Sequence, residues 1–343
     1  YLYFMSKIKL KNMYSSFKKT DLSTLLLLLK SHQAEYLSGQ DLSDVLKISR
    51  VAVWKHVKKI RSLGYNVESK HHLGYKLTDS TDQLLPWEIT QNLDTKLLGK
   101  RVFYFDTLDS TQNFATKIAS NQNENGSIVI SKRQTDGKGR MKRKWESPDG
   151  GVWMSIIIQP EFNISYITLV PIAASLALCI AIEKTLKIKP KLKWPNDILM
   201  KEKKVAGILL DTSIQSNKIE SIILGIGINF KINPHRLENN IKKTPNFYGV
   251  DTLVKKNEKP ITLIKQFLYE LENIFQLIDS GYTKKIITEW TIRSSTIGKN
   301  ISIITNEGKI TGNAIKLDSD GALIISKGQK NKRLLVGDIT HKN

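Results

Sequence analysis

Apolar residues recur at helical spacing early in the chain and predict three helices followed by a hairpin. The helices are expected at residues 22–30, capped by Asp21; at 41–47, opened by a capping box at 38–41; and from Ser49 to Gly64. In the third helix one face is apolar, formed by Val53, Val57, Ile60 and Leu63. Two short β runs at 65–69 and 75–78 follow, joined by residues 70–74.

The opposite face of the third predicted helix is basic. It carries Arg50, Lys55, Lys58 and Arg61 together with Trp54. Helix, tight turn, capped basic helix and hairpin form the pattern of a winged helix-turn-helix, whose second capped helix enters the major groove of DNA. A three-helix protein-interaction module with a solvated basic face is the alternative. The residues predicted to bind DNA, in a helix-turn-helix at about 38–57, are Ser38, Ser49, Arg50, Trp54, Lys55 and Lys58.

The middle of the chain, from about residue 87 to 290, alternates strand-like and helix-like runs. The predicted strands are 102–105, 127–131, 152–158, 205–211 and 221–228, and the predicted helices are 110–120, 166–187, 261–278 and 284–291. Most of the strands are joined by turns rather than by helices. This arrangement favours a mixed α/β sheet over a doubly wound one.

After Gly298 the alternation of strand-like and helix-like runs ends, and short β runs at regular spacing follow. They cover 301–305, 309–317, 322–326 and 334–340, and turn residues separate them. Such spacing indicates a small antiparallel barrel of the SH3-like kind.

The chain of 343 residues is too long for one hydrophobic core and is expected to form an α+β protein of several parts. We expect a disordered extension at 1–20, a winged helix-turn-helix DNA-binding domain at 21–80, a linker at 81–86, a central catalytic domain at 87–292 and the barrel at 297–343.

Composition indicates a globular protein of the cytoplasm. The apolar run 25–29 is too short to cross a bilayer, and the first twenty residues do not resemble a secretory signal. One cysteine excludes an internal disulfide, and Cys179 lies in an apolar run where a buried structural thiol is favoured over a nucleophile. The net charge of +21 suggests polyanionic partners, but lysine is frequent throughout, so charge alone does not identify them.

Residues 132–145 carry the strongest chemical signal. They combine two glycines, seven Lys or Arg, one carboxylate and a closing Trp145. Glycines let a backbone approach a ligand closely, and the cations with exposed N–H groups can cradle phosphate. Alone, this segment could equally be a solvated basic loop or a nucleic-acid patch.

Four more blocks accompany this segment and identify a family. They are Asp-Ser-Thr-Gln at 109–112, Lys-Trp-Pro-Asn-Asp at 193–197, Lys-Val-Ala-Gly-Ile-Leu at 204–209 and Gly-Ile-Gly-Ile-Asn at 225–229. With these blocks in order on a three-part chain, the sequence resembles a bifunctional biotin–protein ligase that also serves as the biotin operon repressor. The resemblance covers nearly everything except the first twenty residues.

The resemblance implies a two-step reaction with ATP, biotin and Mg²⁺. Biotin's carboxylate attacks the α-phosphorus of ATP to give biotinyl-5′-AMP, and a lysine of the biotin carboxyl carrier protein of acetyl-CoA carboxylase then attacks this mixed anhydride. Lys193 is expected to offset the repulsion between carboxylate and phosphate, with Arg140 as the second catalytic residue. Asp197 is a candidate for holding Mg²⁺, and a turn-forming role is the alternative.

The same resemblance assigns the ligand contacts. The biotin residues it implies are Ser110, Thr111, Gln112, Gln134, Lys138, Gly139, Arg140 and Lys204. The ATP residues it implies are Gly137, Arg143, Trp145, Asn196, Gly207 and Asn229. Ser110 is also a natural helix N-cap, and both roles are compatible.

Partners implied by the resemblance are the carrier protein, the operator DNA of biotin-synthesis genes and a second copy of the chain when the adenylate is bound. Two rivals remain: a monofunctional ligase with a vestigial winged helix, and a biotin-responsive repressor without catalysis. Lipoate ligation is a related enzymatic alternative.

One departure from the family pattern concerns the glycine-rich segment. Lys142 stands where the family commonly has glycine, and Asp136 where it has a small residue. Because a β-carbon restricts positive φ, Lys142 is expected to affect how the loop closes.

Overall fold

The computed structural model describes residues 20–33, 35–216, 218–235, 237, 249–254, 258–305, 308–328, 330–335 and 337–341. The chain separates into two compact units, Tyr1–Glu88 and Ile89–Asn343. The extension expected at 1–20 lies outside the described residues, apart from Thr20.

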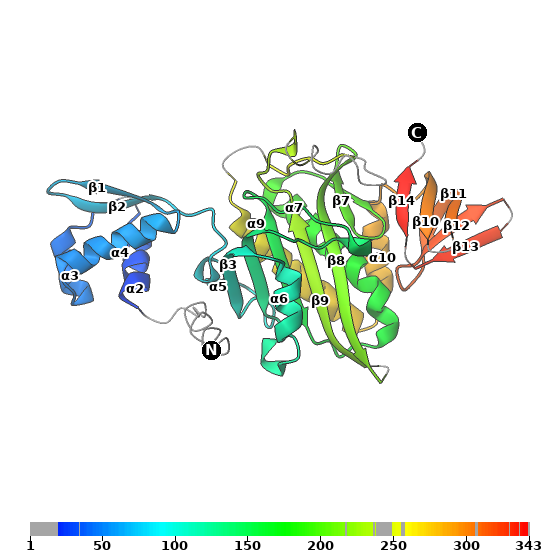
Figure 1. Ribbon diagram of the computed structural model, residues 1–343, viewed down its shortest axis with the longest axis horizontal. Coiled ribbons are helices and arrows are strands. Elements are labelled where there is room, and N and C mark those ends of the chain that lie inside the picture. Colours follow the sequence, from blue (N-terminus) through cyan, green and yellow to red (C-terminus); the bar gives the residue numbers. More distant parts are fainter. Residues whose placement is uncertain are drawn as a thin grey trace. The chain divides into compact units, whose positions relative to one another are not determined.

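Three helices and a hairpin make up the first unit, as predicted (Figure 1). They are α2 (Asp21–Ser31), α3 (Gly39–Leu46), α4 (Arg50–Ser62), β1 (Asn66–Lys70) and β2 (Gly74–Asp79). The core takes Leu25 and Leu29 from α2 and Val53, Val57 and Ile60 from α4, all fully or almost fully buried. The apolar face expected for the third helix is therefore the face that packs.

Side-chain hydroxyls begin each of these helices. The Ser38 and Ser49 hydroxyls accept hydrogen bonds from the backbone N–H of Asp41 (3.0 Å) and Ala52 (3.2 Å), as expected of N-caps. The first helix differs from expectation, because Thr20 rather than Asp21 is its N-cap and forms a capping box with Ser23. A threonine directly before the aspartate takes the cap and places Asp21 in the first turn, where its charge suits the helix dipole.

The segment expected to be a linker, 81–86, has buried positions. Thr81, Leu84 and Leu85 are buried, and the Thr81 hydroxyl donates to the Leu63 carbonyl at 2.7 Å. A short helix, α5 (Pro86–Thr90), follows and crosses the boundary between the two units.

A seven-stranded mixed sheet forms the centre of the second unit. Its strands are β3 (Val102–Leu108), β4 (Ile128–Gln134), β5 (Val152–Ile158), β6 (Lys191–Lys193), β7 (Asp197–Met200), β8 (Lys203–Gln215) and β9 (Lys218–Ile228). The order is β3-β4-β5-β9-β8-β7-β6, in which β3 and β4 are parallel and the other neighbours are antiparallel. The predicted mixed sheet is confirmed; the short strands β6 and β7 were not predicted.

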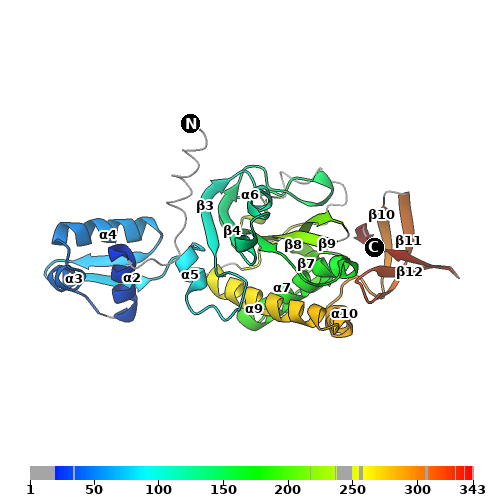
Figure 2. The same cartoon turned by 90° about the horizontal axis from the view of Figure 1, so that it is seen from below.

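Helices cover both faces of this sheet (Figure 2). One face carries α6 (Thr111–Ile118), and the other carries α7 (Val170–Leu186) and α9 (Pro260–Asp279), with α10 (Thr283–Ile292) beside them. Short 3₁₀ turns lie at Gln122–Glu124, Arg140–Lys142 and Ile164–Leu169. Because both its faces are covered, β5 is buried along its whole length.

The helical stretch Ile164–Leu186 is apolar and long enough to cross a bilayer by length and composition alone. It packs against α9 and against strands of the sheet, and Ala173, Leu178 and Ile182 are fully buried. The central helix of a folded core has the same composition, and this packing accounts for it.

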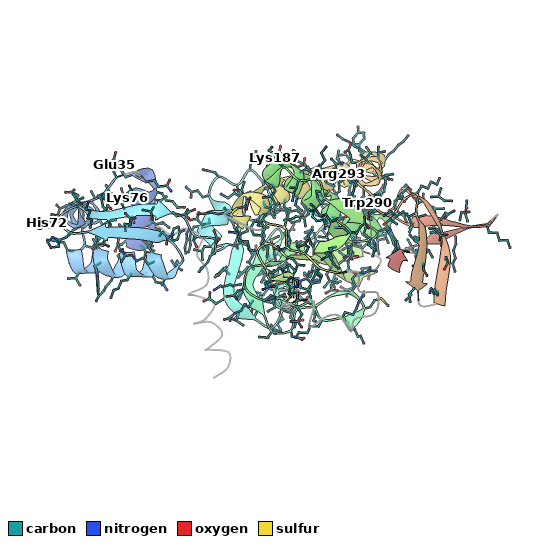
Figure 3. All side chains as sticks on the ribbon, turned by 90° about the horizontal axis from the view of Figure 1, so that it is seen from above. Glu35, His72, Lys76, Lys187, Trp290 and Arg293 are labelled. Atoms are coloured by element: carbon teal, nitrogen blue, oxygen red, sulfur yellow. The ribbon has the colours of Figure 1, made fainter. Side chains whose placement is uncertain are left out.

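Polar side chains fasten α10 to α7. Trp290 Nε1 donates to Ser175 Oγ at 3.1 Å, and Arg293 donates to Glu183. Trp290 and Arg293 are labelled in Figure 3. Cys179 is fully buried on α7, where burial and the neighbouring Glu183 carboxylate raise the pKa of its thiol to about 12. The thiol is therefore protonated at neutral pH, in agreement with the predicted structural role.

Five antiparallel strands follow, in the order β13-β12-β11-β10-β14. They are β10 (Asn300–Thr305), β11 (Gly308–Leu317), β12 (Leu323–Lys327), β13 (Lys330–Leu334) and β14 (Asp338–His341). The single strand predicted at 334–340 is wrong: the chain forms one strand up to Leu334 and another from Asp338. Residues 330–333 are polar and exposed, so this edge strand has no hydrophobic alternation to reveal it.

Candidate functional site

The Asp-Ser-Thr-Gln block follows the C-terminal end of β3 and begins α6. Ser110 is the N-cap, and its hydroxyl accepts from the Gln112 N–H at 3.2 Å. Ser110, Thr111 and Gln112 are all buried, at 0%, 4% and 3% exposure. A hydrogen bond from the Asn113 amide (2.7 Å) lowers the pKa of Asp109 and keeps it ionised at the start of the helix.

Thr111, Gln112, Gln134 and Ser155 form a buried polar network beneath this helix. Gln134 Oε1 accepts from the Thr111 N–H (2.7 Å), the Thr111 and Ser155 hydroxyls lie 2.9 Å apart, and Ser155 Oγ donates to Gln112 Oε1 (2.8 Å). The Gln112 amide group donates to the Ile223 carbonyl at 2.9 Å. Because that partner can only accept, the orientation of the Gln112 amide is determined.

Residues 134–147, the basic loop, fold back on themselves. Isolated antiparallel β-bridges pair the backbone of Gln134 with Ser147 and that of Lys138 with Lys144. The Gly139 N–H donates to the Arg143 carbonyl at 2.8 Å. Met141 (φ +55°) and Lys142 (φ +59°) form the tip in the left-handed region. The position where this chain departs from the family's glycine is thus one that needs positive φ, and Lys142 adopts it at the expense of strain.

The Lys-Trp-Pro-Asn-Asp block forms the hairpin between β6 and β7. Lys193 lies at the end of β6 with 4% exposure and pairs in register with Asp197. The Trp194 N–H donates to Thr296 Oγ1 and its Nε1 to the Gly321 carbonyl, both at 3.0 Å. The hairpin is therefore held by the segment before β10 and by the turn between β11 and β12.

Arg140 reaches from the basic loop to this hairpin. Its Nη1 donates to Asn196 Oδ1 at 3.1 Å and to the Gly337 carbonyl at 3.3 Å. Asn196 is oriented in turn by the 2.5 Å hydrogen bond from its Nδ2 to the Ile208 carbonyl. One guanidinium thus links the loop, the hairpin and the segment before β14.

Asp197 and Lys204 form an ion pair of 2.5 Å between neighbouring strands. The Lys204 ammonium also lies 4.8 Å from the centre of the Trp145 ring. Among the described residues there is no group of three or more His, Cys, Asp or Glu side chains that could hold a metal ion. A single carboxylate already paired with an ammonium does not make a protein-held metal site.

Glycines shape the floor of the site. Gly207 of β8 and Gly227 of β9 are paired, and a β-carbon would come within 3.1 Å of Trp145 at Gly207 and within 2.6 Å at Gly227. The indole of Trp145 therefore lies close to the backbone of both strands, and side chains at these two positions would displace it. Its Nε1 is buried and has no hydrogen-bond partner among the described residues.

These elements surround one cavity of about 190 Å³. The predicted ligand residues that line it are Ser110, Thr111, Gln112, Gln134, Lys138, Gly139, Arg140, Arg143, Trp145, Lys193, Asn196, Asp197, Lys204, Gly207 and Asn229. Gly137 is the exception: it is buried beneath Trp145, whose carbonyl would lie 2.4 Å from an added β-carbon.

Several lining residues were not predicted. Among them are Met154 and Ser155 of β5, Ile208 and Leu209 of β8, Ile226 of β9, Ile339 of β14 and Gly337 just before it. Ser155 and Met154 lie in a continuous apolar strand, and Gly337 follows Arg140 by 197 positions. No local pattern distinguishes Met154, Ser155, Gly337 and Ile339, because only the folded chain brings them to the cavity, whereas Ile208, Leu209 and Ile226 lie within the blocks at 204–209 and 225–229.

Charge in the cavity wall is strongly positive. Among the described residues, six cations line it, Lys138, Arg140, Arg143, Lys144, Lys193 and Lys204, against two carboxylates, Glu146 and Asp197. Both carboxylates are engaged, because Glu146 pairs with Lys144 at 3.2 Å and Asp197 with Lys204. The remaining positive potential suits a polyphosphate or a carboxylate ligand.

The predicted DNA-binding residues lie in the first unit. Ser38 and Ser49 are the N-caps of α3 and α4, and Arg50, Trp54, Lys55 and Lys58 are exposed along α4. Arg61, expected on the same basic face, instead donates to the Val67 carbonyl and to Ser69 Oγ. That residue fastens the hairpin to α4.

Two family models match this chain. The model of the biotin/lipoate A/B protein ligase family matches residues 104–229, and a helix-turn-helix domain model matches 21–76. The two matches fall in the two compact units.

Known proteins resemble the chain over most of its length. It is 34% identical to the bifunctional ligase/repressor BirA of Bacillus subtilis strain 168, over 89% of this chain and 94% of that protein. It is 26% identical to the bifunctional ligase/repressor BirA of Escherichia coli K12, over 89% and 93% of the two chains. The solved biotin protein ligase from Aquifex aeolicus in complex with biotin and ATP superposes with a TM-score of 0.56 at 26% identity, covering 71% of this chain and 99% of that one.

Proposed function

The chain belongs to the family of bifunctional ligase/repressors, and on that premise we propose that it activates biotin with ATP and represses biotin-synthesis genes. The product of activation is biotinyl-5′-AMP, which it transfers to a lysine of the biotin carboxyl carrier protein. The observation that carries this proposal is the single cavity in which all five sequence blocks meet under six cations.

The first step joins two anions. A biotin carboxylate oxygen forms a bond to the α-phosphorus while the bond to pyrophosphate breaks, and negative charge accumulates on the phosphoryl oxygens. The buried Lys193 ammonium, fixed at the end of β6, is suited to neutralise that charge in place of water. Arg140 is suited to hold the other side, since its guanidinium already bridges the loop and the hairpin.

The buried polar network suits the ureido ring of biotin. Thr111, Gln112, Gln134 and Ser155 hold one another in fixed orientations, so little reorganisation is needed when a ring with N–H and C=O groups enters. Met154, Ile208, Leu209 and Ile226 supply an apolar wall for the rest of the bicycle. We assign Ser110, Lys138, Gly139 and Lys204 to the same ligand or its activated carboxyl group.

Trp145, lying on the paired glycines, marks the nucleotide end. Its flat ring suits adenine, while Arg143, Asn196 and Asn229 suit the phosphates and ribose, and Gly207 and buried Gly137 allow the backbone to come close. Mg²⁺ would arrive with the ATP phosphates, and Asp197 is its proposed protein neighbour. The carboxylate of Asp197 is also paired with the Lys204 ammonium.

In the second step the carrier lysine's amine attacks the anhydride carbonyl, AMP leaves and the amine loses its proton. Water must be excluded until then, and the basic loop linked through Arg140 to Gly337 provides a cover. We propose residues 87–292 as the ligase domain and 297–343 as an SH3-like barrel. The protein is proposed to act in the cytoplasm.

The repressor activity is proposed for residues 21–80. The adenylate would favour a homodimer, which presents two α4 helices to the two half-sites of an operator. The family membership and the helix-turn-helix match support this assignment.

Biotin-dependent exchange of labelled pyrophosphate into ATP tests the catalytic proposal. Exchange with biotin and none with lipoate is expected, and no exchange with either would refute the ligase. A footprint on the chain's own biotin-synthesis promoter, with and without biotin plus ATP, tests repression. Protection that requires both compounds is expected, and its absence would leave a monofunctional ligase.

A further inference from the structure

The outward face of α4 combines apolar side chains with cations. Val51 is 62% exposed and Trp54 44% exposed. Arg50, Lys55 and Lys58 surround them, and the Lys58 ammonium lies 3.7 Å from the centre of the Trp54 ring. α4 already buries Val53, Val57 and Ile60 in the core. The exposed side chains of Val51 and Trp54 are therefore not needed for the packing of this helix.

The charge at the start of α4 lowers the stability of the helix. Arg50 is the first residue of α4, where the positive end of the helix dipole disfavours a cation, and α4 has no acidic residue to offset it. Features that oppose local stability mark places where a ligand supplies the missing interaction. A ligand that satisfies Arg50 must be rich in acceptors or negative charge.

The composition of the face distinguishes DNA from a protein partner. Protein interfaces are depleted in lysine, whereas Lys55, Lys58 and Lys59 are all exposed on α4. In the DNA major groove, phosphates, guanine acceptors and the thymine methyl group occur together. The first residues of a recognition helix are the ones that reach base edges, and Val51 is the second residue of α4.

We propose that Val51 and Trp54 read thymine methyl groups, next to a guanine contacted by Arg50. This proposal rests on the proposed DNA-binding function and specifies what that surface recognises. Lys55 and Lys58 contact phosphates and contribute affinity without base preference.

Duplexes selected by the full-length chain from a random-sequence pool, with biotin and ATP present, provide the test. Each thymine of the selected duplex is then replaced by deoxyuridine, which removes the methyl group and keeps the base pair. At one or two positions in each half-site, the replacement should lower the affinity of the chain for the duplex roughly fourfold. This factor corresponds to the free energy of burying one methyl carbon. In Val51→Ala or Trp54→Ala that difference should vanish at one of these positions.

Lys55→Ala is the matched control on the same face. It should weaken binding equally to thymine and uracil duplexes and reduce the salt dependence by about one charge. Equal affinities for thymine and uracil duplexes in the unaltered chain would overturn the methyl contacts, as would an unchanged difference in both variants. Failure of the unaltered chain to select any duplex would overturn DNA binding itself, a separate result. Melting curves show whether the variants fold.

Discussion

Lys193 combines two properties that seldom coincide in one lysine: it is almost wholly buried, and it lines a cavity open to ligands. Replacing it with methionine keeps the length of the side chain and removes the charge. We expect the rate of pyrophosphate exchange to fall by about 10²–10³, because one fixed transition-state charge is lost. Lys191→Met is the matched control, since Lys191 is exposed two residues earlier on β6. A similar rate in both variants would remove Lys193 from catalysis.

Lys142 illustrates strain at a single residue. A side chain in the left-handed region costs about 1–2 kcal/mol relative to glycine, and more when it is β-branched. Lys142→Gly should therefore favour the observed loop and slow the loss of adenylate, whereas Lys142→Val should speed it. Release of labelled adenylate from the two variants measures this order. Equal release rates would mean that the tip of the loop does not limit retention.

At the scale of elements, the C-terminal sheet supports the hairpin that carries Lys193. Trp194 reaches Gly321 and Thr296, and Thr168 Oγ1 donates to the Asp320 carbonyl at 2.8 Å. Arg333 secures the same turn through Asp318 and Asp320. The turn at 318–321 therefore contributes to the rigidity of the hairpin, beside the contacts from Thr296 and Arg140.

Trp194→Phe tests that support. The change leaves the Gly321 carbonyl buried without its donor, which costs about 1–3 kcal/mol. We expect a lower free energy of unfolding together with a lower kcat for adenylate formation, while KM for biotin stays within about twofold because the polar network is elsewhere. Urea unfolding and exchange kinetics measure the two effects. A change in KM alone would contradict the assigned positioning role.

Elements with a strong pattern were predictable, and the short ones were not. The amphipathic helix α4 and the apolar strand β5 follow directly from their sequences. β6 and β7 have three and four residues around Trp194-Pro195, too few for a periodic signal. Apart from Gly137, the site residues named by motif line the cavity, whereas Ser155 and Ile339 reach it only through strand pairing and Gly337 lies directly before β14. The ligand and catalytic roles of the residues named by motif remain predictions.

At the scale of the whole molecule, the two units divide the two proposed activities. Every residue lining the cavity, from Ser110 to Ile339, belongs to the second unit. A chain that begins at Pro86 keeps α5 whole and lacks α2, α3 and α4. We expect it to lose operator binding in a gel-shift assay and to keep pyrophosphate exchange. Retained operator binding would place the DNA-binding surface in the second unit.

The link from Arg140 to the Gly337 carbonyl has a consequence for synthesis of the protein. A ribosome must translate almost two hundred codons beyond Arg140 before the pocket has all its walls. A nascent chain therefore cannot enclose its adenylate early, and a message cut short before codon 337 yields a protein in which Arg140 keeps its hydrogen bond to Asn196 but lacks the one to Gly337.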